Sequence, residues 1–208
     1  MYEAKKPVTT SEAVQAILGE KFDNQERKVI DHIDALCRAW IERSPFITIA
    51  TTNRRGQVDV APKGDPAGFV TILDERTLAI PDRLGNNRGD TLHNIVDHPR
   101  IGLMFMVPLR NEVLRVSGGA RIVQDDEILE TMVVNDKQPD MAILVDVEEA
   151  MFHCGKSIIR SRLWQPDAWA SVDGLPSYAS AVKTHAAMPE PIEYFEAMMK
   201  FNDEQRLY

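Results

Sequence analysis

The sequence predicts a mainly β protein of the α+β class, an antiparallel barrel or sandwich with flanking helices. Between residues 46 and 123, short β-branched runs alternate with turn signals at close spacing. Helical periodicity lies mostly outside this region, before residue 45 and after residue 124. With 208 residues, the chain is long enough for one domain with a large core. We therefore expect one structural domain in three parts: a helical extension packed on the barrel (1–45), the barrel (46–164), and a C-terminal wrap and helix (165–208).

The sequence of the N-terminal part, residues 1–45, predicts two helices. A capping box at residues 9–12 begins a short helix that Gly19 ends. A second capping signal, Asp23 with Glu26, begins the best-defined helix, whose apolar residues follow i, i+3, i+4 spacing from 29 to 41 until Pro45 stops it. Cys37 lies on the apolar side of this helix and is expected in the core rather than as a nucleophile.

The barrel strands follow in order. Residues 46–52 and 57–61 form a hairpin, and Pro62 is expected to end their pairing, which would leave Lys63 in an irregular segment. Further strands are expected at 69–73, 77–80, 101–107, 113–123 and 141–147. A Gly118–Gly119 pair predicts a bulge at a barrel corner. Helices are expected shortly after residue 90 and at 125–134, 155–163 and 191–206, while residues 167–191 wrap the surface.

The loop at residues 81–92 is the centre of the prediction. It leaves a strand and begins a helix, and a helix N-terminus attracts anions. Arg88 adds a planar fork that matches phosphate oxygens. Asn86 and Asn87 tolerate unusual backbone angles, Gly89 allows close approach, and Asp90 can cap the helix. An ordinary turn with a solvated arginine is the alternative.

Four stretches together resemble the pyridoxamine 5′-phosphate oxidase-like family. They are FITIATT at 46–52, GQVDVAPKGD at 56–65, NRGDTLHNI at 87–95 and HCGKSIIRSRLW at 153–164. The resemblance implies an FMN-binding split β-barrel with flanking helices, a homodimer, and FMN at the subunit interface. It covers roughly residues 46–164.

The resemblance also implies where the cofactor binds. The segment after the second strand and the start of the short helix would line FMN, and the C-terminal end of the domain would reach the flavin, often from the partner subunit. These positions are Ala61, Pro62, Lys63, Gly64, Asn87, Arg88, Gly89, Asp90, Arg162 and Trp164. Lys63 and Arg88 are the first choice for a phosphate, which needs more than one cation. A solvated loop lysine and a packed helix-end aromatic are the alternatives for Lys63 and Trp164.

The expected function is that of an FMN-dependent oxidoreductase acting on a small organic substrate. Pyridoxamine-phosphate oxidases carry an Arg-x-His segment, and the comparable residues here are Arg162, Leu163 and Trp164, which argues against vitamin B6 oxidation. A non-catalytic flavin- or haem-binding module on the same barrel is the alternative, and a cofactor-free barrel is a third.

Other classes of function lose support. The formal net charge of −8 argues against nucleic acids and anionic membranes. His93 and His98 lack metal-ligand spacing, and hydrolase, Walker and dinucleotide motifs are absent from the sequence. Two cysteines make no disulfide framework, and the N-terminus has no apolar signal core, so a cytoplasmic location is expected.

Overall fold

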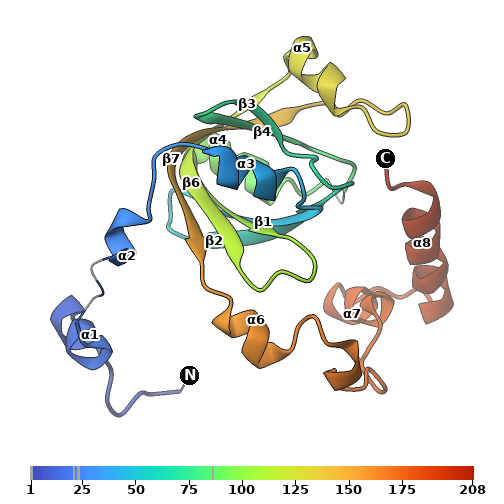
Figure 1. The fold of residues 1–208 in the computed structure, drawn as a ribbon. Coiled ribbons are helices and arrows are strands. Elements are labelled where there is room, and N and C mark those ends of the chain that lie inside the picture. Colours follow the sequence, from blue (N-terminus) through green and yellow to red (C-terminus); the bar gives the residue numbers. More distant parts are fainter. Residues whose placement is uncertain (1, 21, 23, 86) are drawn as a thin grey trace.

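The computed structural model describes residues 2–20, 22, 24–85 and 87–208, and its centre is one curled antiparallel sheet (Figure 1). Seven strands lie in the order β2-β1-β5-β6-β7-β4-β3. Their bounds are β1 Phe46–Thr52, β2 Val58–Gly64, β3 Thr71–Asp74, β4 Thr77–Pro81, β5 Arg100–Met106, β6 Val113–Val123 and β7 Ala142–His153. The mainly β prediction is confirmed. The expected roles of Asp23 and Asn86 lie outside the described residues.

Eight α-helices are described around the sheet. Their bounds are α1 Ser11–Leu18, α2 Asn24–Arg27, α3 Ala35–Ile41, α4 Asp90–Asp97, α5 Asp126–Leu129, α6 Lys156–Ser161, α7 Tyr178–His185 and α8 Ile192–Gln205. Thr10 caps α1 by accepting a hydrogen bond from the Ala13 amide. However, α1 has no buried residue, and Figure 1 shows α1 and α2 extending away from the sheet. The division of the chain at residues 45 and 164 stays a prediction.

The core lies inside the curled sheet. Strand side chains alternate between two faces, so Ile47 and Ile49 of β1 are buried while their neighbours are partly exposed. Phe105 of β5 and Leu114 of β6 join them in one apolar cluster, to which Cys37 of α3 also belongs. The burial of Cys37 confirms that it is a core residue.

A bulge in β6 allows this sheet to bend. The register between β6 and β7 shifts between Ser117 and Gly118. At Gly118 the backbone of β7 comes so close that a Cβ atom would lie 1.9 Å from the Asp146 carbonyl oxygen. Only glycine fits this approach, so the predicted bulge is confirmed together with its cause.

The long helix predicted for residues 23–41 is wrong. The structure has two short helices, α2 and α3, separated by an extended segment. In that segment Ile30 exchanges backbone hydrogen bonds of 3.0 and 2.7 Å with Ala150, and the Ile33 amide donates to the Glu75 carbonyl at 2.7 Å. Asp34 then begins α3 by accepting from the Cys37 amide at 2.8 Å. Backbone pairing with β7 and with the turn between β3 and β4 therefore replaces helical hydrogen bonds here.

Pairing of β2 does not end at Pro62, contrary to the prediction. Pro62 lies opposite Thr48, and the ladder continues through Lys63 to Gly64. A proline is tolerated because β2 is an edge strand of the sheet. Lys63 consequently has a fixed strand orientation rather than a loose loop position.

The segments outside the barrel depart from the prediction in smaller ways. The helix expected at 125–134 is the short α5 followed by a 3₁₀ turn, Glu130–Met132. The wrap expected at 167–191 contains an additional helix, α7, which packs on α8 and buries Ala179 and Phe195. In Figure 1 these two helices lie apart from the sheet, and the C-terminal end of the chain turns back toward it.

Candidate functional site: a pocket at the N-terminus of α4

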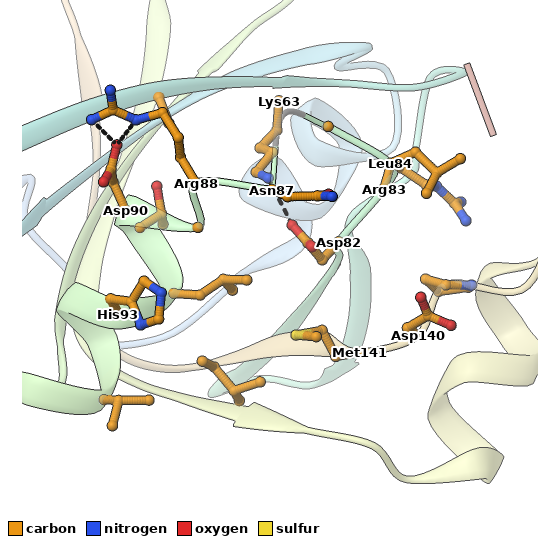
Figure 2. A pocket seen from close by; sticks show the side chains of 18 of the residues that line it. Lys63, Asp82, Arg83, Leu84, Asn87, Arg88, Asp90, His93, Asp140 and Met141 are labelled. Atoms are coloured by element: carbon orange, nitrogen blue, oxygen red, sulfur yellow. Dashed lines mark hydrogen bonds and ion pairs between the residues drawn. The ribbon is translucent and has the colours of Figure 1, made fainter. Parts of the chain in front are cut away.

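A pocket of about 650 Å³ opens between β2, the loop before α4, and the segment at 137–141. Its size is typical of small-molecule and cofactor sites. The lining residues used below are Asp59, Ala61, Lys63, Asp82, Arg83, Asn87, Arg88, Gly89, Asp90, His93, Lys137, Asp140, Met141 and Tyr208. Figure 2 shows labelled side chains from β2, the loop before α4, the start of α4 and the segment at 140–141 around this pocket.

Helix α4 presents its N-terminus to this pocket. Gly89 is the N-cap in a left-handed conformation, with φ of 63°, and no side chain caps the helix. The prediction that Asp90 caps α4 is therefore wrong, because Asp90 is the first helical residue. Amide groups of the first turn thus keep the capacity to bind an anion.

Two side-chain hydrogen bonds fix α4 on the sheet. Thr91 donates its hydroxyl to Asp59 of β2 at 3.0 Å, and Asn94 donates its amide to Thr51 of β1 at 3.0 Å. The first of these bonds ties the N-terminal turn of α4 to the strand that carries Lys63. The helix end and the lysine therefore have a defined relative position.

Arg88 lies at the exposed side of the pocket. Its guanidinium pairs with Asp90 at 2.8 Å, and its side chain is 71% exposed. Figure 2 shows the two side chains turned toward each other at the start of α4. A pair this exposed contributes only about 0–1 kcal/mol, so an incoming phosphate can replace the carboxylate at small cost.

Lys63 lies deeper and is more constrained. Its Nζ donates to Asp82 at 2.8 Å, and both side chains are less than a quarter exposed. In Figure 2 the Asn87 side chain lies beside this pair. An anion at Lys63 must share the ammonium with Asp82. The ammonium can serve both partners because it carries three N–H donors.

The described part of the wall is balanced in charge. It carries four Lys or Arg side chains and four Asp side chains: Lys63, Arg83, Arg88 and Lys137 against Asp59, Asp82, Asp90 and Asp140. Selectivity for an anion must therefore come from local geometry at α4 rather than from the net field. In the described residues no group of three His, Cys, Asp or Glu side chains could hold a metal ion.

The sequence analysis did not predict the residues at the end of the pocket that lies away from Arg88. Arg83 donates to Asp65 at 2.7 Å and to the Met132 carbonyl at 2.7 Å. Tyr208 donates its hydroxyl to the other oxygen of Asp65, also at 2.7 Å. These partners are up to 143 residues apart in the chain, and no local motif marks them.

The structure brings six of the ten predicted site residues together. Ala61, Lys63, Asn87, Arg88, Gly89 and Asp90 all line the pocket. Pro62 and Gly64 belong to the other face of β2, because strand side chains alternate, and they do not line it.

Arg162 and Trp164 lie elsewhere on the same chain. Arg162 ends α6 in a left-handed conformation, and the Trp164 indole donates to the Arg110 carbonyl at 2.7 Å. Neither residue lines the pocket. Their role at the flavin stays a prediction that requires a second subunit.

Comparison with known protein families identifies the family to which the chain belongs. A family model described as Pyridoxamine 5′-phosphate oxidase matches residues 33–154, more than half of the chain. The chain belongs to this family. The match includes β2, the loop before α4 and the 137–141 segment, which together form most of the pocket wall.

Solved structures with similar folds are distant in sequence. HupZ of Group A Streptococcus is 21% identical, with 57% of this chain and 91% of that chain covered and a TM-score of 0.48. An FMN-binding protein from Syntrophomonas wolfei is 13% identical over 55% of this chain and 82% of that chain, with a TM-score of 0.44. A structure named F420 reductase is 17% identical over 56% and 94%, with a TM-score of 0.40. No curated protein matched the chain.

Among the described residues of this family member, no helix combines the length and apolar character needed to cross a bilayer.

Proposed function

We propose that the protein is an FMN-dependent oxidoreductase that binds the flavin in the pocket at α4. The observation that carries the proposal is the convergence of Lys63, Arg88 and the open N-terminus of α4 on one pocket within the family-matched region. A phosphate monoester needs several donors at once, and Arg88 together with the first-turn amides of α4 provides them, while Lys63 adds a cation for another part of the same ligand.

The donor set also suggests a division of roles. Arg88 and the first-turn amides of α4 hold the phosphate, while Lys63 lies farther along β2 and meets a more interior part of the ligand. Asn87 and Asp82 offer amide and carboxylate groups to polar edges of the ligand. When bound, the flavin supplies the redox chemistry, and these residues bind it, orient it and exclude water.

A second copy of the chain would complete this site. The outer surface of β2, β1 and β5 is largely apolar and open, with Val58 and Val60 69% and 65% exposed. Register places Val60 beside Ala50, and Pro62 and Met104 on either side of Thr48, so these side chains form one continuous surface. We propose that two chains pair through this surface and that Arg162 and Trp164 of one approach the pocket of the other.

The cysteines support a proposal for the cellular location. Cys37 and Cys154 are both free thiols, which is compatible with a reducing compartment. We propose the cytoplasm.

The first test is the absorption spectrum of the purified protein, with mass identification of what heat releases. Flavin bands and released FMN are expected. A protein that is colourless and does not bind added FMN would contradict the proposal.

The phosphate site is tested by Arg88→Ala, with Arg76→Ala as the matched control. Arg76 is also an exposed arginine paired with an aspartate, Asp31, but lies outside the pocket. Loss of a charge-assisted hydrogen bond is expected to weaken FMN binding by about tenfold to a hundredfold in Arg88→Ala. The control should bind like the wild type, and equal affinity in both variants would show that the phosphate binds elsewhere.

The dimer is tested by light scattering on Val60→Glu, with Val172→Glu as the control. Val172 is 72% exposed but lies outside the barrel. A charge in the centre of the apolar surface should produce monomers, whereas the control should stay dimeric. A wild-type monomer at assay concentration would refute the pairing.

A haem-binding module is the second candidate, and one observation favours it. The imidazole of His93 lies in the pocket wall, and histidine is a common axial ligand of haem iron. The same spectrum distinguishes the two candidates, because haem gives a Soret band that flavin lacks.

A further inference from the structure

Tyr208 forms a compact cluster with Asp65 and Arg83 at the end of the pocket away from Arg88. The Asp65 side chain is 1% exposed, and each of its oxygens accepts one strong hydrogen bond at 2.7 Å, from Tyr208 and from Arg83. The Arg83 guanidinium also lies 5.6 Å from the centre of the Tyr208 ring, within cation–π distance. The phenol thus holds the carboxylate and covers the guanidinium at once.

The cluster joins segments that are otherwise far apart in the chain. Asp65 directly follows β2 and is tied to Pro45 by its backbone amide. Arg83 belongs to the loop before α4 and reaches the Met132 carbonyl after α5. Tyr208 follows α8, and both Tyr208 and Arg83 line the pocket.

We propose that Tyr208 is a positioning residue that, through Asp65, holds Arg83 in the pocket wall and closes that end of the pocket over its ligand. The part of this inference that concerns the ligand rests on the proposed flavin function. The contact with Arg83 does not, because it is a property of the chain alone.

The chemistry of the cluster makes the phenol hydroxyl specifically important. A nearly inaccessible carboxylate oxygen that loses its donor pays a desolvation cost, whereas a solvated one does not. The hydrogen bond to Asp65 and partial burial raise the pKa of Tyr208, so the hydroxyl remains a proton donor throughout the neutral range. Phenylalanine keeps the ring over Arg83 but leaves the Asp65 oxygen without its partner.

The first experiment tests whether Tyr208 holds Arg83 through Asp65, and it requires no cofactor. Phenylglyoxal labelling followed by peptide mass spectrometry compares Arg83, which is 14% exposed, with Arg88, which is 71% exposed and serves as the internal reference. Tyr208→Phe and Tyr208→Ala should raise labelling of Arg83 severalfold relative to Arg88. Tyr194→Phe is the matched control, because Tyr194 is an exposed tyrosine on α8 outside the pocket, and should label like the wild type.

The second experiment tests whether Tyr208 closes the pocket over its ligand. Stopped-flow displacement of bound FMN should show release about tenfold faster in Tyr208→Phe, the change that loss of one charge-assisted hydrogen bond predicts. Tyr194→Phe should release FMN at the wild-type rate.

The outcomes separate the two proposals. Unchanged Arg83 labelling in both Tyr208 variants would overturn the positioning role. Increased labelling with an unchanged release rate would overturn closure of the pocket. A wild-type chain that never binds FMN would refute the proposed function, and closure over a flavin would fail with it. The labelling would still decide whether Tyr208 holds Arg83.

Discussion

The bulge at Gly118 gives the sharpest stability prediction. In Gly118→Ala the new Cβ would lie 1.9 Å from the Asp146 carbonyl oxygen, whereas real Cβ atoms essentially never come closer than 3.0 Å to a neighbour. The backbones of β6 and β7 must therefore separate by about 1.1 Å at this point, the difference between the two distances. The obstruction is backbone, so no side-chain rotation can relieve it.

The magnitude follows from what this separation disturbs. Roughly two ladder hydrogen bonds beside the bulge weaken, together losing about 1 kcal/mol, and overpacking in a closely packed sheet costs about 1–3 kcal/mol more. We expect a loss of roughly 3 kcal/mol in the free energy of unfolding. For a chain of this length, that corresponds to a decrease in Tm of about 6–12 °C.

Gly119 provides the matched control. A Cβ there would lie 3.7 Å from the nearest atom, a side-chain oxygen of Asp146, which is an ordinary contact. Gly119→Ala should therefore change stability by about 0.5 kcal/mol or less. Urea unfolding of the two variants and the wild type at one protein concentration measures the difference. If Gly118→Ala is within about 0.5 kcal/mol of Gly119→Ala, the close approach of β6 and β7 is not as described.

Three further predictions concern the rest of the fold. Asp34→Ala removes the cap of α3 and should cost about 1 kcal/mol at pH 7. Because the hydrogen bond from the Cys37 amide lowers the pKa of Asp34 below its ordinary 3.8, this difference is complete above pH 3.8 and is lost as the pH falls through the lower folded pKa. Thermal melts of both proteins at pH 7 and at a series of pH values below 3.8 would show the loss. Burial raises the pKa of Cys37 to about 12, so a thiol reagent should modify only the exposed Cys154 in the folded protein, and Cys154→Ser should abolish the reaction. Gly68 has a φ of +85° and a Cβ there would lie 3.1 Å from the Glu42 carbonyl, so Gly68→Ala should lower the unfolding free energy by about 1–3 kcal/mol.

Contrary results would be equally specific. Equal melting of the wild type and Asp34→Ala at pH 7 would show that the cap does not form. Rapid reaction of a second thiol under native conditions would show that Cys37 of α3 is not buried in the core. A fully stable Gly68→Ala variant would show that the turn does not need its left-handed conformation.

The strands were predictable because their signal is local. Residues 46–52 and 113–123 were delimited correctly from β-branched alternation and turn residues, and these patterns exist within each segment. Even the bulge could be predicted, since a glycine inside a strand often marks a bulge or a close approach of another backbone. Local sequence was sufficient wherever local pairing determined the structure.

The wrong predictions concern segments whose local structure depends on contacts with residues far away in the sequence. Val29, Ile30 and Ile33 fit a helical period, but the backbone of Ile30 pairs with Ala150, a contact that no window of the sequence contains. Pro62 was expected to end a strand, but an edge position tolerates it. Both outcomes depend on the arrangement of the sheet, which follows from the whole chain.

The candidate site shows the same limit. Arg88 and Gly89 were recognised because a loop before a helix has a local signature, and Lys63 because of a family resemblance. Asp82 and Tyr208 were missed, since an aspartate in a loop and a tyrosine beyond a helix are ordinary by themselves. Their importance appears only when the fold brings Asp82 to Lys63 and Tyr208 to Asp65.

The alternation of β2 has a consequence for how binding events influence one another. Ala61 and Lys63 form the wall of the pocket, while Val60 and Pro62, on the same strand, form the open apolar surface. A strand one residue thick cannot shift on one side without shifting on the other. The pocket and the outer surface therefore share a single strand, and by thermodynamic linkage any effect of one occupant on the affinity of the other is reciprocal and equal in size. On the proposed flavin site and the proposed pairing through this surface, flavin affinity measured at several protein concentrations tests whether the two sites are coupled.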